Sequence, residues 1–463
     1  MQNLIWRVVH RHSVLVGIVL IAVIALIRFS YGFSYVPGEL PKSDECEKDI
    51  GALMSRQGHS EDLLWRGCMA VHNTSEQLKR YTTNRFNKSA TSEKSCISCH
   101  DGQAAPTFAT LWTRFPRFNP TLGKSESFAD AIRGEFITRY SGTMPVRTDV
   151  SITTIYHYAF AKASQAGLTF AMESGDDKID DGLLDRENTT ASCRRVFSQF
   201  GQPRGPNAPY IVRGCNLVTD THNRVPKLMR VWRTDVKCES CHREAGNRPY
   251  AGSLAMAAVY LPYMKTLLNK PIRFDRRVLM CFARSLNWID IGEDSKVLHK
   301  IRMYANWLAQ KQNLKIGVWY EGRGIPMLPD TVGAGASILA GEAVFKQRCI
   351  FCHGENGWGG RGPIYNGIEP PPIAGPNSFN HTAATSHRVI LGGFALNNMP
   401  PGATHDVPIL TKQEALDVAI YLESLGRPAD FAHNNNLSVF ANYLWQNGLY
   451  YISKPFLAQE SDQ

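Results

Sequence analysis

The sequence predicts a mainly α-helical chain of three consecutive domains behind one N-terminal apolar segment. At 463 residues the chain has the length of about three domains. Apolar residues recur at intervals of three and four in three stretches, which is the spacing that one buried helical face requires. These stretches are 151–160, 296–308 and 414–422. The pentapeptide Cys-x-x-Cys-His also occurs three times, at 96–100, 238–242 and 349–353.

Composition indicates a folded chain with a positive charge. Hydrophobic residues make up 43% of the sequence, enough for packed cores, and the formal net charge is +10. Such a charge raises nucleic acid, a membrane surface or anionic ligands as partners. Because the lysines and arginines are scattered and form no basic block, we do not expect nucleic-acid binding.

Residues 1–35 are expected to form a signal anchor with one transmembrane helix. An apolar run extends from Val14 to Ile27, and Arg7 and Arg11 before it favour a cytoplasmic N-terminus. Arg28 and several aromatic residues follow the run in place of a small-x-small cleavage site. The run is short for a full span, so a cleaved signal peptide is the alternative. We therefore predict a single-pass protein of the inner membrane, with the rest of the chain in the periplasm.

The repeated pentapeptide is the attachment signature of c-type haem. Its two thiols add to the haem vinyl groups, and the adjoining histidine binds the iron. Three copies behind an export signal predict three covalently bound haem c groups, with zinc sites or disulfide pairs as the alternatives. The predicted attachment residues are Cys96, Cys99, His100, Cys238, Cys241, His242, Cys349, Cys352 and His353.

Four further cysteines indicate an internal duplication. Cys46 and Cys68 are 22 residues apart, as are Cys193 and Cys215, and the second pair is the first shifted by 147 residues. Four cysteines allow three pairings, and the repeated spacing favours Cys46–Cys68 and Cys193–Cys215. Disulfides indicate an oxidising compartment outside the cytoplasm.

The order of these features predicts the domain organisation. Each copy of the duplication runs from a disulfide to a haem motif, then to a ligand candidate and a closing helix. The last part begins with a helix over 341–348. It ends with a second helix, for which Thr411 and Glu414 would form an N-terminal capping box. This order resembles the class I cytochrome c fold. The expected parts are the anchor 1–35, haem domains 36–175, 188–320 and 336–428, and an aromatic tail 429–463.

Two methionines are candidate sixth ligands of the iron. Met399 lies 46 residues after His353, and Met144 lies 44 residues after His100; each precedes a proline. A thioether ligand favours ferrous iron and raises the reduction potential. Core filling is the alternative role for either methionine. His157 and Lys94 are the alternative ligands for the first haem.

The middle part carries Cys281 where its neighbours carry Met-Pro. An unpaired cysteine in an exported protein is exposed to oxidation, so its presence indicates a function. As a thiolate on iron it would lower the potential. Arg277 and Arg284 would stabilise the thiolate and an incoming anion. Met280 remains an alternative ligand, and an inert buried thiol is the alternative for Cys281.

From about residue 230 to 431 the chain resembles the dihaem thiosulfate dehydrogenases, whose first domain is related to SoxA-type sulfur-oxidation cytochromes. The matching motifs are the haem motif 238–242 with 243–249, Asp275-Arg-Arg277, Cys281–Ser285, Tyr304–Leu308, the haem motif 349–353 with 354–357, 377–380, Asn398-Met399-Pro400 and 427–431. The resemblance implies that Cys281 ligates the active-site haem and that thiosulfate binds beside it. It also implies that Arg277 and Ser285 matter for activity and that the next haem passes electrons outward.

The implied reaction joins two thiosulfates into tetrathionate and could also run in reverse. Arginines suit it, because two dianions must approach each other. The chain departs from the family at two places. It has only Lys265 and Lys270 near the position where the family has a further arginine, and it has Asn398 where the family often has a lysine. The first domain looks like a second SoxA-like domain with Met144 in place of the cysteine. We expect it to transfer electrons to a membrane-side or periplasmic protein. The alternative is a non-catalytic conduit between a quinol oxidase or reductase and an acceptor.

Overall fold

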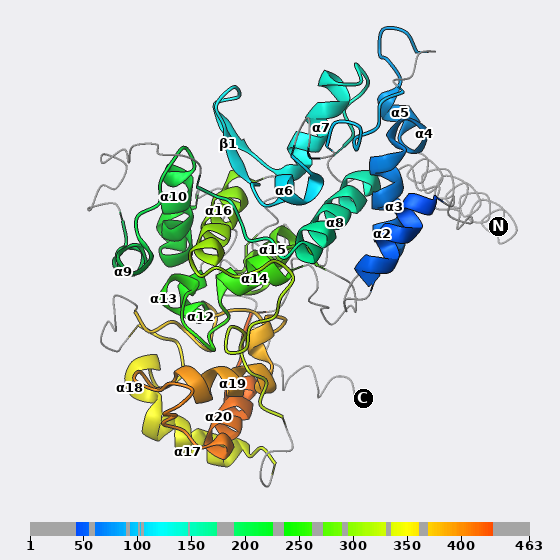
Figure 1. Cartoon of the computed structure of the whole chain (residues 1–463). Helices are drawn as coiled ribbons and strands as arrows, with labels where there is room; N and C mark the ends of the chain where they lie inside the picture. The colour runs from blue at the N-terminus through cyan, green and yellow to red at the C-terminus, as the bar shows by residue number, and fades with distance from the viewer. Residues whose placement is uncertain are drawn as a thin grey trace, which may run out of the picture. The chain divides into compact units, whose positions relative to one another are not determined.

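The computed structural model confirms a mainly α-helical chain (Figure 1). The structure describes residues 43–54, 61–88, 93–100, 102, 106–146, 149–173, 189–225, 236–261, 272–288, 295–329, 335–360 and 369–428. The described residues from 44 onward belong to one compact unit. The expected anchor 1–35 and the tail 429–463 lie outside them. Among the helices in the described ranges, each is too short or too polar to cross a bilayer.

We refer to residues 43–173 as the first segment, 189–320 as the middle segment and 335–428 as the last segment. The first contains helices α2 Asp44–Met54, α3 Glu61–His72, α4 Thr74–Gln77, α5 Lys79–Thr82, α6 Phe108–Trp112, α7 Phe128–Thr138 and α8 Val150–Gln165. It also contains the antiparallel strands β1 Arg117–Asn119 and β2 Lys124–Glu126, with Arg117 opposite Glu126.

In the described parts of the other two segments, the regular elements are all helices, joined by turns and loops. The middle segment contains α9 Ala191–Phe200, α10 Ala208–Thr219, α11 Thr221–Arg224, α12 Cys238–Cys241, α13 Arg243–Gly246, α14 Leu254–Tyr260, α15 Phe274–Arg284 and α16 Lys296–Lys311. The last segment contains α17 Ile338–Arg348, α18 Ile350–His353, the 3-10 helix η3 Ala384–Ser386, α19 Arg388–Asn398 and α20 Lys412–Ser424.

The expected closing helices are α8, α16 and α20, and each crosses an earlier helix at a glycine. The pairs in the described part of the chain are α3 with α8, α10 with α16 and α17 with α20 (Figure 1). A Cβ added at Gly67, Gly214 or Gly341 would lie 2.3, 2.0 or 1.9 Å from a backbone carbonyl oxygen of the partner helix. Only glycine allows so close an approach. A tyrosine lies beside each glycine: Tyr158, Tyr304 and Tyr421.

The start of α20 confirms the expected capping box. The Glu414 amide donates to Thr411 Oγ1 at 3.1 Å, and the Thr411 amide donates to Glu414 Oε2 at 2.8 Å. Helix α17 begins three residues before the expected position, because the Ser337 side chain accepts a hydrogen bond from the Ala340 amide and caps it there.

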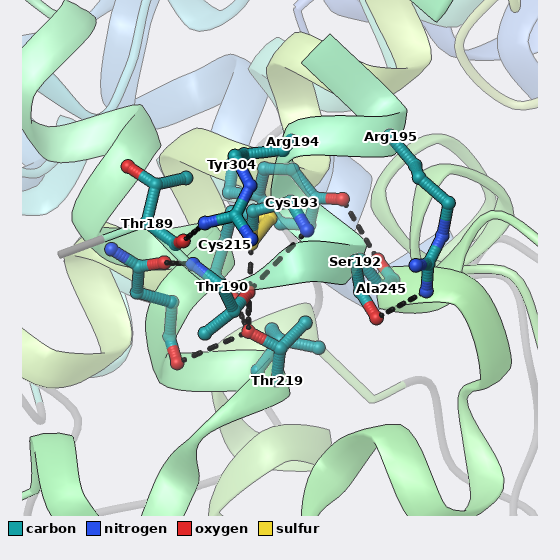
Figure 2. The surroundings of a disulfide bond; sticks show 12 residues. Thr189, Thr190, Ser192, Cys193, Arg194, Arg195, Cys215, Thr219, Ala245 and Tyr304 are labelled. Atoms are coloured by element: carbon teal, nitrogen blue, oxygen red, sulfur yellow. Dashed lines mark hydrogen bonds between the residues drawn. A yellow bond between two sulfur atoms is a disulfide. The ribbon is translucent and has the colours of Figure 1, made fainter. Parts of the chain in front are cut away.

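Both predicted disulfides are present, joining Cys46 to Cys68 and Cys193 to Cys215. Figure 2 shows the second one among threonines: the Thr190 hydroxyl lies 2.7 Å from that of Thr219, which donates to the Cys215 carbonyl. The Tyr304 hydroxyl in the same view donates to the Ala245 carbonyl at 2.8 Å. This part of the closing helix is therefore tied to the turn that follows the middle haem motif.

The duplication extends to single threonine side chains. Thr74 Oγ1 donates to the Val71 carbonyl and accepts from the Cys96 amide. Thr221 Oγ1, 147 residues later, donates to the Val218 carbonyl and accepts from the Cys238 amide. Each threonine thus ties the end of a helix to the first cysteine of a haem motif.

The first and middle segments share one hydrophobic core, which Phe379 and Ala383 of the last segment join, while the other core residues of the last segment form a separate cluster. Polar contacts also join α16 of the middle segment to the first segment. Asn306 Nδ2 donates to the Phe115 carbonyl at 3.0 Å, and Trp307 Nε1 donates to Glu173 at 2.9 Å. The domain limits predicted from the sequence stay predictions.

Candidate active site and haem sites

The three motif histidines are oriented alike. Nδ1 of His100, His242 and His353 lies 3.0, 2.5 and 2.9 Å from the carbonyl oxygen of Pro106, Gly252 and Pro371, respectively. A carbonyl can only accept, so each Nδ1 carries a proton and each Nε2 is the nitrogen left to bind a metal. A backbone carbonyl that fixes the tautomer in this way is the usual outer partner of a histidine that binds a metal.

The last motif borders a cavity suited to a haem. The cavity and the open space at its mouth together have a volume of about 880 Å³, and the walls include Cys349, Cys352, His353 and Met399. Apolar side chains such as Leu391 and Phe394 make up most of the rest. Burial, with a smaller contribution from the Arg243 charge, lowers the pKa of His353 and keeps its imidazole neutral, as iron binding requires.

The middle and last haem motifs adjoin. Ser240 and Cys241, which belong to the middle motif, line the same cavity as the last motif. The charge of Arg243, immediately after that motif, acts on both Cys241 and His353. Two groups attached at these motifs would therefore be neighbours.

The middle site brings His242 and Cys281 together. The imidazole of His242 lies within hydrogen-bonding range of the Cys281 thiol, although 39 residues separate them in sequence. Helix α12 carries Cys238 and Cys241 three residues apart, on one side of a single turn. The charges of both thiols interact with that of Cys281.

Electrostatics distinguish Cys281 from the attachment cysteines beside it. Burial raises the pKa of Cys238 to about 11 and that of Cys241 to about 12. Burial acts on Cys281 in the same direction, but Arg277, His242 and Arg284 outweigh it, and the pKa of Cys281 is lowered. Of these three thiols, Cys281 is the one suited to act as a thiolate.

Helix α15 places the predicted catalytic residues in one line. Arg277, Cys281 and Ser285 follow each other at intervals of four, so they share one face of the helix and its C-cap. Met280, the alternative ligand, packs against the hydrophobic core. This placement favours Cys281 over Met280 as the residue that faces His242.

The first site has the attachment residues but a different surrounding. Cys96 Sγ lies 3.2 Å from Thr74 Oγ1, the hydroxyl oxygen that also accepts from the Cys96 amide. Burial raises the pKa of Cys96, and the Glu135 carboxylate adds to the rise. Met144 is 48% exposed. Of the alternatives, Lys94 is exposed and His157 is buried in α8, so the sixth ligand of the first haem stays a prediction.

The structure adds contacts that hold the Met399 loop to the middle segment. Arg248 donates through Nε to Asn398 Oδ1 at 3.0 Å and through Nη2 to the Ala403 carbonyl at 2.7 Å. Asn398 Nδ2 donates to the Tyr250 carbonyl at 3.0 Å. Sequence analysis singled out Asn398 only for the lysine it replaces, because Arg248 lies 150 residues away along the chain.

The last segment also holds the C-terminal end of α15. Asn380 donates through Nδ2 to the Ala283 carbonyl at 3.1 Å and through its amide to the Arg284 carbonyl at 2.9 Å. These carbonyls lie in the final turn, where the helix supplies no N–H donors of its own. The lysine-bearing loop with Lys265 and Lys270 lies outside the described residues.

Comparisons with known proteins agree on one family. The family model for cytochrome c matches residues 338–426. A thiosulfate dehydrogenase of Allochromatium vinosum is 30% identical over 230 residues, covering 49% of this chain and 81% of that protein. A thiosulfate dehydrogenase of Thiomonas intermedia is 33% identical over 196 residues, covering 42% of this chain and 60% of that protein.

A solved structure is also similar to this chain. It is the thiosulfate dehydrogenase (TsdBA) of Marichromatium purpuratum in its "as isolated" form, with 25% identity and a TM-score of 0.45. The match covers 64% of this chain and 58% of that one. The chain thus spans less than two thirds of the solved protein and of the Thiomonas relative.

Proposed function

The chain belongs to the thiosulfate dehydrogenase family of haem c oxidoreductases, and we propose that it oxidises thiosulfate to tetrathionate and passes the electrons through three covalently bound haem c groups. The observation that carries the proposal is the position of Cys281. Its thiol faces His242, its pKa is lowered by Arg277, His242 and Arg284 against the effect of burial, and it lies in line with Arg277 and Ser285.

The reaction requires a site that can bind two anions side by side. Two thiosulfate dianions form one bond between their sulfane sulfurs, and two electrons leave. Arg277 and Arg284 offset the repulsion between the dianions and orient them. The Ser285 hydroxyl, one turn beyond Cys281, can donate to a sulfonate oxygen.

Three bound haems would supply acceptors that take up the two electrons one at a time. His242 and Cys281 would hold the middle group, and His353 and Met399 would hold the last one. A thiolate lowers the reduction potential and a thioether raises it, so this ligand order favours electron movement from the middle to the last site. The shared cavity wall at Ser240 and Cys241 supports a short route.

The proposal places the haem segments in the periplasm, anchored to the inner membrane by residues 1–35. The apolar run Val14–Ile27 and the two disulfides support it. The first haem, held by His100 and Met144, would exchange electrons with a membrane-side or periplasmic protein.

The proposal is tested with the oxidised full-length protein, without oxygen. Thiosulfate should produce the absorption bands of reduced cytochrome c. Sulfate, a dianion without a sulfane sulfur, should produce none. Tetrathionate should reoxidise a chemically reduced sample if the reaction runs in reverse. If thiosulfate does not reduce the protein and tetrathionate does not reoxidise it, the protein is instead an electron conduit.

A further inference from the structure

The start of the Cys281 helix is held by a buried hydrogen-bonded chain. Asp275, in the first turn of α15, accepts from Arg302 Nη1 at 2.6 Å. Arg302 lies on α16 and donates through Nη2 to the Tyr156 hydroxyl, also at 2.6 Å. Tyr156 belongs to α8 of the first segment and is 3% exposed. The three helices involved are labelled in Figure 1.

The Tyr156 ring lies near two arginines at the start of α15. The guanidinium of Arg273, the N-cap of α15, lies 5.6 Å from the centre of the Tyr156 ring. The guanidinium of Arg302 lies 5.4 Å from the same ring. A buried guanidinium is costly unless its charge and its N–H groups are paired. Asp275 neutralises the charge of Arg302, and Tyr156 fills a further hydrogen-bonding position.

These hydrogen bonds affect the active site because a shift in the first turn of a helix also shifts the residues that follow it. Arg277 follows Asp275 by two residues, and Cys281 follows by six, about 9 Å along the axis at 1.5 Å per residue. The last segment fixes the other end of α15 through Asn380. A site of this kind requires its groups to be held within about 0.5 Å.

We propose that Tyr156 of the first segment is a positioning residue for the Cys281 helix, so that the first segment supports the active site in addition to carrying its own haem. The inference rests on the proposed function for what the site does, but the contacts that carry it do not depend on the substrate. Tyr156 lies outside the stretch 230–431 that resembles the dihaem enzymes, so this support belongs to the duplicated architecture of this chain.

The test replaces Tyr156 by phenylalanine in the full-length protein and uses Tyr158→Phe as the matched control. Tyr158 lies on the same helix, and its hydroxyl donates to Asp49 at 2.6 Å within the first segment. Each variant therefore loses one hydrogen bond of similar length and keeps its ring. Haem content and the thermal midpoint verify that both variants fold.

Two readouts do not depend on activity. The low-spin electron paramagnetic signal of the thiolate-ligated haem should broaden or split in Tyr156→Phe, and the midpoint potential of that haem should shift. Both should stay unchanged in Tyr158→Phe. The value of kcat/KM for thiosulfate should fall about tenfold in Tyr156→Phe and less than about twofold in the control.

A second variant tests the route of the effect. If Tyr156 acts through Arg302 and Asp275, Tyr156→Phe should add little to the spectral change caused by Asp275→Asn, because residues of one network are not additive. Identical spectra and potentials in Tyr156→Phe and the wild type would overturn the proposal. A wild type that thiosulfate does not reduce would contradict the proposed function alone, since the spectral comparison would still decide the role of Tyr156.

Discussion

The first and middle segments are built on the same plan, yet the helix before the closing helix presents different charges in each. Both have a disulfide of the same spacing, a glycine at the helix crossing and a threonine that ties the first motif cysteine. The helix before the closing helix differs. Helix α7 brings the Glu135 carboxylate towards Cys96, whereas α15 brings Arg277 and Arg284 towards Cys281.

This difference indicates how a duplicated scaffold acquires two roles. The shared features would hold a haem attached at each motif, and the helix before the closing helix would decide what can approach it. Arg277 and Arg284 would attract a dianion towards Cys281, whereas Glu135 near Cys96 is paired with Arg139 at 3.2 Å and offers no such attraction. The difference in function therefore depends on the helix before the closing helix and not on the features that the two segments share.

The strongest test of this comparison removes the candidate ligand in each segment. Cys281→Ala should lower the rate of haem reduction by thiosulfate by more than about 100-fold, because it removes the thiolate that defines the site. Met144→Ala should leave the first reduction step within about threefold of the wild type. Stopped-flow absorption measures both, and haem content should remain that of the wild type. Equal losses in the two variants would remove the distinction between the segments.

The next test addresses the charge carried by α15. Arg277→Ala should lower kcat/KM for thiosulfate by about 10- to 100-fold, the range expected for a lost hydrogen bond to a charged group. Arg276→Ala is the matched control, because Arg276 is the exposed neighbour on the same helix and carries the same charge. Steady-state assays at two salt concentrations separate contact from long-range attraction. A similar loss in both variants would mean that net charge alone attracts the substrate.

The helix crossings provide a test of what the segments share. Gly67→Ala and Gly214→Ala should each destabilise the fold by about 3 kcal/mol, because the new methyl group would overlap a backbone carbonyl. Gly134→Ala in α7 is the control: its Cβ meets no atom within 4 Å, and the change should stabilise the helix by up to about 1 kcal/mol. Denaturant unfolding measures all three. Since the two segments share a core, both losses should appear in one transition.

Sequence analysis predicted what depends on spacing along the chain. The haem motifs, the paired cysteines and the closing helices are local or repeated patterns, and both disulfides were confirmed. The alignment of Arg277, Cys281 and Ser285 follows from helical periodicity once α15 is known to be a helix. The assignments of the iron ligands and of the catalytic residues stay predictions.

Contacts between distant segments could not be predicted. Arg302 and Tyr156 are 146 residues apart, and Arg248 and Asn398 are 150 apart. Neither pair belongs to a repeated pattern or to a shared helix face. Each pairing depends on how the segments pack, which the sequence of one segment does not specify.

The smallest effect concerns the threonines that tie the motifs. Thr74→Val and Thr221→Val each remove a hydroxyl that accepts from a motif cysteine amide and donates to a helix-end carbonyl. Each should cost about 1 kcal/mol of unfolding free energy, the usual net value of a neutral hydrogen bond. Thr138→Val in α7, whose exposed hydroxyl bonds only within its own helix, is the control and should change little. Equal losses of unfolding free energy at 74 and 221 would show that the threonine has the same role in both segments. A loss at 221 alone would mean that the two segments differ in their shared features as well as in the helix before the closing helix.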